Sequence, residues 1–236
     1  MFDSGSEIIK QTFRPGAGLA LPPLSFAGPG APRCAGLPLA LKRQLDVVLA
    51  ALLLLVFGLP MLVIALLIRL ESPGPALFHQ RRVGLDGASF MILKFRTMRV
   101  QRLPGDRLRQ ARPGDPRVTA IGHWLRCLSL DEMPQLMNVL RGEMSLVGPR
   151  PHAPGTCVCG RTFEQVTPRY TARHRVLPGM TGLAQVRGWR GETETEDKLL
   201  HRVDSDLEYI GTWSLWLDLV ILARTVGVVL GMRNAY

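Results

Sequence analysis

An uncharged apolar run from Val47 to Ile68 constrains this chain more than any other feature of its sequence. The run has 22 residues, and a straight helix of that length measures about 33 Å, enough to cross the hydrocarbon layer of a bilayer. Gly58 and Pro60 lie near its middle. Because an internal proline removes a backbone hydrogen bond and clashes with the carbonyl four residues earlier, we expect a sharp kink at Pro60.

The charges around the run leave its topology open. Lys42 and Arg43 precede it, and Arg69 follows it directly. Basic residues favour the cytoplasmic side of a membrane, and because they flank both ends here they do not assign those ends to opposite sides. The run is therefore compatible with a single spanning anchor and with a re-entrant hairpin, which would leave both flanks in the cytosol.

The two ends of the chain have different compositions. Residues 1–38 are rich in Pro, Gly and Ala and lack a secretory signal, so they predict a flexible arm. Near the C-terminus, Trp213 and Trp216 begin an apolar stretch that also carries Asp218 and Arg224. This stretch predicts an amphipathic helix with both tryptophans on one face, lying either at a membrane interface or against the core. A second spanning helix is disfavoured because both charges would enter hydrocarbon.

The polar region between these segments, roughly Glu71 to Ile210, predicts a soluble domain of mixed α and β structure. Alternating apolar and polar residues around a Gly-Leu-Asp-Gly turn predict a β-hairpin of Phe78–Val83 and Ser89–Phe95. Further along, Pro134 can open a helix and Gly142 can close it. The helix expected just before this one carries Ile121, Trp124, Leu125 and Leu128 on one face.

The chain is strongly basic, which narrows its partners to anionic ones. It has 29 Lys and Arg against 19 Asp and Glu, a net charge of +10. Such a charge favours a phosphate-rich ligand, nucleic acid or an acidic membrane surface. The histidines have no metal-ligand spacing, and no phosphate-binding glycine loop or dinucleotide fingerprint is present. Aromatic residues amount to only 6%, which is sparse for nucleic-acid binding.

One acidic pair, Asp131 and Glu132, stands out in the stretch "SLDEMPQLMNVLRGEMSLVGPRP". In a structural interpretation Asp131 caps the following helix, or Ser129 and Glu132 form a capping box. In a functional interpretation one carboxylate attacks a phosphoryl centre while the other binds a divalent cation. Capping requires one acid, whereas the sequence has two.

Basic residues near this pair would offset the repulsion between a carboxylate and a diphosphate. Arg150 is restricted on both sides by Pro149 and Pro151, and a guanidinium held in this way suits bidentate phosphate contacts, although a solvated turn residue is the simpler alternative. Lys94 and Arg96 alternate along an expected strand and would share one face. The candidate phosphate ligands are Lys94, Arg96, Arg117, Arg126 and Arg150.

Taken together, these motifs resemble a known family. Residues 42–236 are similar to the bacterial sugar transferases called monotopic phosphoglycosyl transferases. The resemblance starts at Lys42-Arg43-x-x-Asp46 and the apolar run with Pro60. It continues through "FHQRRVG", "KFRTM", "DPRVTAIGHWLR", the acidic stretch and "PGMTGLAQVRG", in the order typical of the family.

The resemblance implies a mostly helical α+β fold and a membrane location. It implies a re-entrant membrane helix over residues 39–70, broken at Pro60, and a cytosolic catalytic domain over residues 71–236 that ends in an interfacial helix. The protein would lie at the bacterial inner membrane. The short arm gives no basis for regulation or dimerisation through the N-terminal segments that many relatives carry, although a homodimer is compatible with the family.

The resemblance also implies a reaction. Asp131 would attack the β-phosphate of a UDP-sugar and release UMP, with Glu132 as a ligand of Mg²⁺, and undecaprenyl phosphate would then accept the phosphosugar. The Pro149-Arg150-Pro151 turn would contact the nucleotide or its phosphates. Lys94, Arg96 and Arg126 would line the active site, and Arg117 is a further substrate-binding candidate.

The C-terminal stretch "GWRGETETEDKLLHRVDSDLEYIGTWSLWLDLVILARTV" and His152 narrow the resemblance. They are similar to members that transfer glucose 1-phosphate in the first membrane step of exopolysaccharide or capsule synthesis. Galactose or another sugar is the alternative donor. A membrane-tethered basic binding module is an alternative of another class, and we expect no nucleic-acid partner.

Overall fold

The computed structural model describes residues 37–99, 115–191 and 193–230, so nearly all of the expected N-terminal arm lies outside the described residues. The described part is mostly helical with three small two-stranded sheets. Its helices are α1 (Leu37–Glu71), α2 (Ala120–Cys127), α3 (Gln135–Arg141), α4 (Phe163–Val166), α5 (Leu183–Val186), α6 (Glu196–Thr212) and α7 (Leu215–Leu230). Its strands are β1 (Leu77–Val83), β2 (Ser89–Phe95), β3 (Ser145–Val147), β4 (Cys157–Val158), β5 (Arg161–Thr162) and β6 (Gly179–Thr181). Three 3₁₀ helices complete it: η1 (Leu85–Gly87), η2 (Leu130–Glu132) and η3 (Pro168–Arg175).

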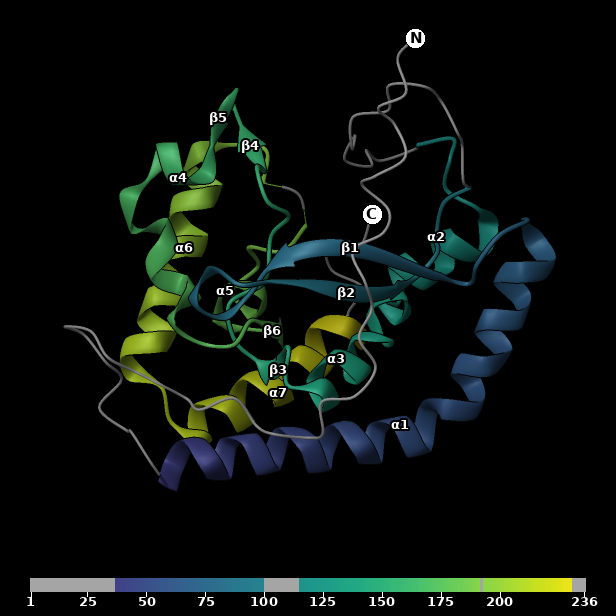
Figure 1. The fold of residues 1–236 in the computed structure, drawn as a ribbon, viewed down its shortest axis with the longest axis horizontal. Helices are drawn as coiled ribbons and strands as arrows, with labels where there is room; N and C mark the ends of the chain where they lie inside the picture. Colours follow the sequence, from purple (N-terminus) through teal and green to yellow (C-terminus); the bar gives the residue numbers. More distant parts are fainter. Residues whose placement is uncertain (1–36, 100–114, 192, 231–236) are drawn as a thin grey trace, which may run out of the picture.

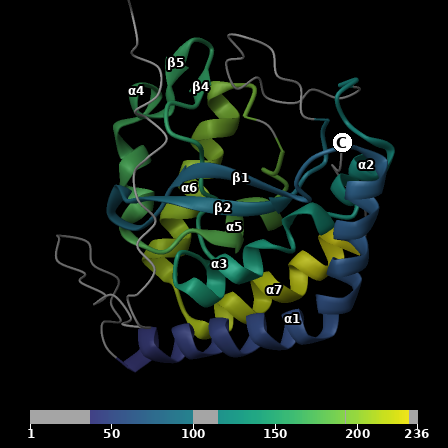
Figure 2. The same cartoon turned by 45° about the vertical axis from the view of Figure 1, so that its right-hand side comes forward.

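The apolar run forms the long helix α1, with Pro60 in its interior. The helix runs beneath the body and then turns upward beside α2 (Figures 1 and 2). A proline is a common cause of such a bend because it breaks the hydrogen-bond ladder. Among the described residues, this is the one helix long and apolar enough to cross a membrane, and its most apolar window is only 6% buried.

The predicted hairpin is confirmed. Strands β1 and β2 pair antiparallel, with Leu77 opposite Phe95 and Val83 opposite Ser89. The hairpin lies across the middle of the body (Figure 1). Asn138 of α3 fixes it there, because its side chain accepts from the Leu93 amide at 3.0 Å and donates to the Met91 carbonyl at 2.8 Å. This places the end of β2 against the segment between α2 and α3.

Helices α2 and α3 agree with the sequence-based prediction in position but not in every side chain. Pro134 directly precedes α3, and Gly142 ends it in the left-handed conformation at φ 83°. Leu125 is buried as expected, whereas Trp124 is 64% exposed. Of the residues expected on one face of α2, Leu125 is thus buried and Trp124 is not, and the other buried residue of this short helix is Gly122.

The parallel strands β3 and β6 approach closely just before the Pro-Arg-Pro turn. A Cβ atom on Gly148 would lie 2.6 Å from the Leu177 carbonyl oxygen, and one on Gly179 would lie 2.1 Å from the Gly148 nitrogen. Because real Cβ atoms do not come so close to backbone, only glycine permits this approach at either position. The Gly179 amide then donates to the Pro149 carbonyl at 2.9 Å.

The last helix, α7, packs with α5, β3 and β6, and it lies between α3 and α1 in Figures 1 and 2. Trp216 of α7 is 74% exposed, while Asp218 is buried. Trp213 precedes α7 as the C-terminal cap of α6, and its indole donates to Asp218 at 3.1 Å. The two tryptophans therefore do not share a helical face, because the helix break at Trp213 and Ser214 turns Trp213 inward.

A buried polar network joins the first and last helices. The Lys42 ammonium donates to Asp218 at 2.7 Å and to the Val147 carbonyl at 3.2 Å. The Tyr209 hydroxyl oxygen lies 2.7 Å from Asp218 Oδ1 and 3.1 Å from the Val147 carbonyl oxygen, and its single proton can be donated to either acceptor. Because charged groups are costly to bury unless they are paired, this network explains how α7 can carry an acid on its packed face.

Candidate active site

The acidic pair lies in η2, in the connection between α2 and α3. Ser129 precedes it in the left-handed conformation, at φ 56°. Non-glycine residues rarely adopt this conformation, and such strain is concentrated at functional sites. Helix α3 has no side-chain cap, and the Ser129 hydroxyl does not cap η2. Neither acid acts as the expected helix cap, because the chain makes a separate 3₁₀ turn before α3.

Glu132 is held by two cations that the sequence places far from it. Lys94, near the end of β2, donates to Glu132 Oε1 at 2.6 Å. Arg150 donates to both carboxylate oxygens: Nη1 to Oε2 at 3.0 Å, and Nη2 to Oε1. Burial opposes ionisation of Glu132, but Arg150 and Lys94 outweigh it and hold its pKa well below the usual range. Glu132 is therefore an anion at all physiological pH values.

The pKa of Asp131 is shifted in the opposite direction. Burial raises its pKa to about 6, with Lys94 opposing the shift and the Glu132 anion adding to it. Its carboxylate accepts no hydrogen bond from the part of the chain that the structure describes. A carboxylate without hydrogen bonds, and with a raised pKa, has more electron density available for attack than one tied to donors.

The Pro-Arg-Pro turn has its backbone fixed at consecutive positions. The carbonyls of Pro149 and His152 accept from the amides of Gly179 and Val83, at 2.9 and 3.1 Å. The Pro151 carbonyl accepts from Arg82 at 3.3 Å. Both prolines are buried, whereas the side chain of Arg150 is 33% exposed. The turn therefore presents one guanidinium from a rigid frame.

The other predicted phosphate ligands are divided between the site and the framework. Arg126 donates to Thr97 Oγ1 at 2.8 Å and is among the charges that lower the pKa of Asp131. Arg117 pairs with Asp115 at 2.7 Å. Arg96 is buried, and its guanidinium donates to the carbonyls of Ile68, Ser72 and Pro73 at the end of α1. The structure thus brings Lys94, Arg126 and Arg150 to the acidic pair, while Arg96 secures α1.

Sequence reasoning missed two cations near the site. Arg190 donates to the Ser129 hydroxyl at 2.8 Å, two residues before Asp131. Arg82 is held beside the turn, where burial and Arg150 lower its pKa to about 10, so it remains charged at neutral pH. Arg82 occurs within the motif "FHQRRVG" and Arg190 within "GWRG", but only the folded chain shows which residues they contact.

This arrangement suits a phosphorylated, anionic ligand. Two carboxylates lie among Lys94, Arg126 and Arg150, and planar guanidinium groups match phosphate geometry. No cluster of three or more His, Cys, Asp or Glu side chains suited to a metal is found in residues 37–99, 115–191 and 193–230. Among the described residues, the carboxylates at this site that could bind a cation are those of Asp131 and Glu132.

Comparison with known proteins places the chain in a family. The family model described as "Bacterial sugar transferase" matches residues 37–232. The protein belongs to this family of sugar transferases.

Several curated relatives are similar over the same region. A UDP-glucose:undecaprenyl-phosphate glucose-1-phosphate transferase of Caulobacter vibrioides is 55% identical over 195 residues, 83% of this chain and 72% of that protein. An undecaprenyl-phosphate glucose phosphotransferase of Komagataeibacter xylinus is 50% identical over 195 residues, 83% of this chain and 37% of the relative. A UDP-glucose:undecaprenyl-phosphate glucose-1-phosphate transferase of Escherichia coli K12 is 49% identical over 187 residues, 79% of this chain and 39% of the relative. The matched region thus spans most of the first relative but little more than a third of the other two.

Proposed function

We propose that this protein transfers glucose 1-phosphate from UDP-glucose to undecaprenyl phosphate and releases UMP, the first membrane step of exopolysaccharide or capsule synthesis. The observation that carries the proposal is a pair of adjacent carboxylates with different environments and with pKa shifts of opposite direction. Glu132 is ionised and fixed by Lys94 and Arg150, whereas Asp131 has a raised pKa and no hydrogen-bond donor among the described residues. The family and the names of the relatives support the same reaction.

In this mechanism the nucleophile is the carboxylate of Asp131. An oxygen of Asp131 forms a bond to the β-phosphorus of the donor, the bond to the bridging oxygen breaks, and UMP leaves. The sugar phosphate remains attached to Asp131 as an acyl phosphate. A phosphate oxygen of undecaprenyl phosphate then attacks the same phosphorus and regenerates the carboxylate. Arg150, Lys94 and Arg126 stabilise the charge that builds up on the phosphate oxygens.

The acidic pair also fits a Mg²⁺ ion. Mg²⁺ prefers oxygen ligands and is commonly held by one or two carboxylates together with substrate phosphates. Glu132 would hold it here, and the bound ion would neutralise phosphate charge. Lys94 and Arg150 make three contacts to the two Glu132 oxygens, so a cation bound by Glu132 would share that carboxylate with them.

The covalent step is tested by omitting the acceptor. Purified protein incubated with UDP-glucose and Mg²⁺ should release about one equivalent of UMP and gain the mass of a hexose phosphate on the peptide that contains Asp131. The Asp131→Asn variant is the matched control and should gain no such mass. UMP release that strictly requires undecaprenyl phosphate, without an adduct, would indicate direct transfer between the substrates instead.

The choice of sugar rests on resemblance. Two less similar relatives, each 41% identical, are named for N-acetylgalactosamine and galactose transfer. A panel of UDP-sugars scored by UMP release with undecaprenyl phosphate present tests the assignment. UDP-glucose should give the highest kcat/KM, and a higher value for UDP-galactose would reassign the donor while preserving the reaction.

The contacts of α1 support a re-entrant helix at the inner membrane, with the catalytic body in the cytosol. At one end, Lys42 contacts α7 and β3, and Arg43 donates to the Leu140 carbonyl at 3.2 Å. At the other end, Arg96 binds the carbonyls that close the helix. A straight spanning helix separates its ends by about 30 Å across the membrane, whereas here one body holds both ends.

Topology is tested by cysteine labelling in spheroplasts. The four native cysteines are replaced by serine, and a single cysteine is introduced for Leu41, which is 49% exposed, or for Arg69. A membrane-impermeant maleimide should label neither position until the membrane is opened. Labelling of one flank but not the other from outside would identify a spanning helix.

A further inference from the structure

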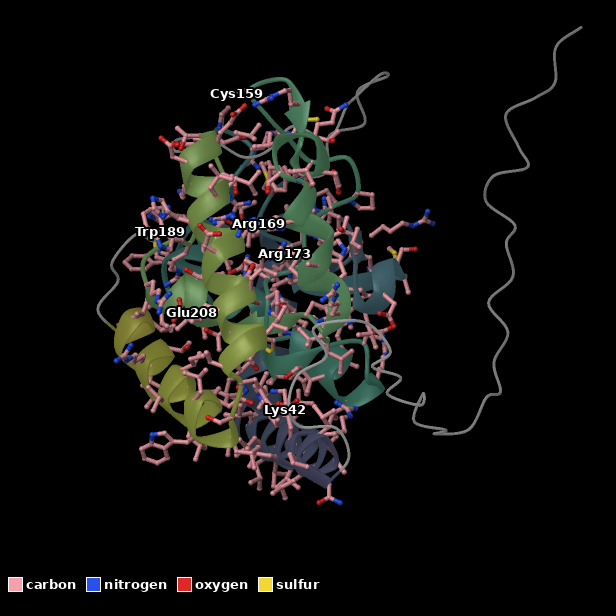
Figure 3. The ribbon with its side chains drawn as sticks, turned by 90° about the vertical axis from the view of Figure 1, so that its left-hand side faces the viewer. Lys42, Cys159, Arg169, Arg173, Trp189 and Glu208 are labelled. Atoms are coloured by element: carbon pink, nitrogen blue, oxygen red, sulfur yellow. The ribbon has the colours of Figure 1, made fainter. Side chains whose placement is uncertain are left out.

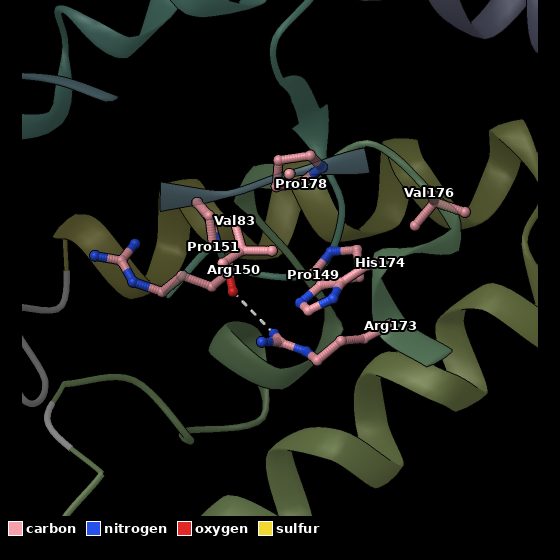
Figure 4. Close-up of a pocket in the computed structure, with 9 residues that line it drawn as sticks. Val83, Pro149, Arg150, Pro151, Arg173, His174, Val176 and Pro178 are labelled. Carbon is pink, nitrogen blue, oxygen red and sulfur yellow. Dashed lines mark hydrogen bonds between the residues drawn. The ribbon is translucent and has the colours of Figure 1, made fainter. Parts of the chain in front are cut away.

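The back of the Pro-Arg-Pro turn is held by a buried arginine that the proposed mechanism does not use. Arg173 lies in η3 and is 3% exposed. Its Nη2 donates to the Arg150 carbonyl at 2.9 Å. Figure 4 shows this bond, with the Arg150 side chain extending away from Arg173. One arginine thus binds the backbone of the residue whose side chain binds Glu132.

All three nitrogens of the Arg173 guanidinium are engaged. Nε and Nη2 donate to Asp206 Oδ2 on α6, the former at 3.0 Å. Nη1 donates to His152 Nδ1 at 2.6 Å and to the Tyr170 hydroxyl at 3.3 Å. Together with the bond to Arg150, these five contacts equal the number of N–H groups that an arginine has. The ion pair with Asp206 is almost completely shielded, with both side chains 2% exposed.

The same contacts define the state of His152, which directly follows the turn. An arginine can only donate, so Nδ1 of His152 must accept and the neutral ring carries its proton on Nε2. Burial and the charge of Arg173 lower the pKa of His152 well below its usual value. His152 is therefore a neutral acceptor that helps to orient Arg173, and it is not available as an acid at this site.

We propose that Arg173, fixed by Asp206, is a positioning residue for sugar-phosphate transfer, because it holds the Arg150 carbonyl and so aims the Arg150 guanidinium at the donor phosphates. The other carbonyls of the turn are held by backbone amides or by Arg82. At Arg150 the frame depends on the buried side chain of Arg173, which also pairs with Asp206. This proposal rests on the proposed function, because it takes Arg150 to bind the donor.

The chain offers a matched control on the same two elements. Arg169 of η3 pairs with Asp204 of α6 at 2.8 Å. Arg169 is four residues before Arg173, and Asp204 is two residues before Asp206. That pair is 62% and 54% exposed. Figure 3 shows both arginines beside α6. The Arg169–Asp204 pair joins η3 to α6 without contacting the turn. A variant of this pair therefore tests general support of η3, whereas a variant of Arg173 also tests support of Arg150.

A double-mutant cycle tests the proposal. Arg173→Lys keeps the buried charge but has three donors instead of five and no fork geometry. We expect it to lower kcat/KM for the UDP-sugar about tenfold to a hundredfold, whereas Arg169→Lys should change it less than twofold. In an Arg150→Ala background, Arg173→Lys should have less than a twofold further effect, because the group that it positions is gone.

Each outcome has one interpretation. If Arg173→Lys lowers activity by the same factor with and without Arg150, Arg173 acts only through general stability and the proposal is wrong. The urea midpoint of each variant shows whether it is folded. Should Arg173→Lys not accumulate as folded protein, Asp206→Asn takes its place in the cycle with the same expectations. Wild-type protein that releases no UMP from any UDP-sugar would instead refute the proposed function.

Discussion

Two arginine–carboxylate pairs lie on opposite sides of one turn, and they differ in how firmly they are enclosed. On the front, Arg150 pairs with Glu132, with side chains 33% and 19% exposed. On the back, Arg173 pairs with Asp206, and both are 2% exposed. Ion pairs open to solvent exchange partners at little cost, whereas breaking a buried pair leaves an uncompensated charge. The front pair can therefore yield to a substrate or cation, while the back pair keeps the geometry fixed.

The largest effect should come from the front of the turn at Asp131. Asp131→Asn preserves size but removes the attacking anion, so UMP release should fall by roughly 10⁴-fold or more, as for other enzymes that lose their nucleophile. The measurement is single-turnover UMP release from UDP-glucose. A variant within tenfold of the native rate would mean that another group attacks the phosphorus.

The same variant should be more stable than the native protein. Asp131 has a pKa raised from 3.8 to about 6, so its ionisation opposes folding. The protonated form of Asp131 favours the folded state, so the free energy of unfolding of the native protein falls as pH rises from about 4 through 6. An asparagine at this position is neutral throughout and causes no such fall. At pH 7 we expect a gain of about 1 to 3 kcal/mol in the free energy of unfolding, measured by urea denaturation. Asp206→Asn should show the opposite sign, because it leaves the buried Arg173 without its counter-charge.

Loss of the Glu132 charge should give the next largest effect. Glu132→Gln keeps the shape but weakens both the contact to Arg150 and any contact to Mg²⁺, so kcat should fall by about 10²- to 10³-fold. Titration of activity with Mg²⁺ should also show a higher requirement. An unchanged Mg²⁺ dependence in this variant would show that Glu132 is not a ligand of the metal.

The pH dependence of kcat/KM distinguishes the role of Asp131 from that of Glu132. Because Asp131 must be ionised to attack, kcat/KM should fall about tenfold per pH unit below roughly pH 6 in the native enzyme. Lys94→Met removes a charge that lowers the pKa of Asp131, so the acidic limb should move to higher pH. Glu132→Gln removes a charge that raises the pKa of Asp131, so the acidic limb of this variant's pH profile should move to lower pH. Shifts in the same direction for both variants would contradict this electrostatic assignment.

The smallest effect is expected at Arg190. Arg190→Ala removes the donor to Ser129 but leaves Lys94, Arg126 and Arg150 in place, so we expect a loss of about threefold to tenfold in kcat/KM. Ser129→Ala removes the same hydrogen bond from the other side and serves as the matched variant. If the hydrogen bond is what matters, the two losses should be similar and not additive; a much larger loss for Arg190→Ala would indicate a direct contact with substrate.

Local signals in the sequence predicted much of the fold. Alternation and a glycine turn located the hairpin, and Pro134 and Gly142 bracketed α3. Each depends on residues close together in the chain. The error at Trp213 arose because a helix break at Ser214 is not visible in an apolar pattern.

The site was harder to predict because its contacts join distant residues. Lys94 and Arg150 meet Glu132 across 38 and 18 positions, and Arg190 meets Ser129 across 61. The residues themselves favoured helix capping for Asp131 and Glu132, and only the family resemblance favoured catalysis. Arg96 illustrates the limit: alternation placed it beside Lys94, yet its guanidinium binds the end of α1.

The bond between Lys42 and Asp218 sets an order of assembly. The two residues are 176 positions apart, so α1 leaves the ribosome long before the carboxylate that neutralises Lys42 exists. Until α6 follows, the Val147 carbonyl lacks its contact to Tyr209, and until α7 follows, Lys42 lacks its contact to Asp218. A chain interrupted before Asp218 would carry the acidic pair and the partners of the Pro-Arg-Pro turn, but Lys42 would lack its contact to α7. The packing of α1 against the body is thus completed only after α7 has been made.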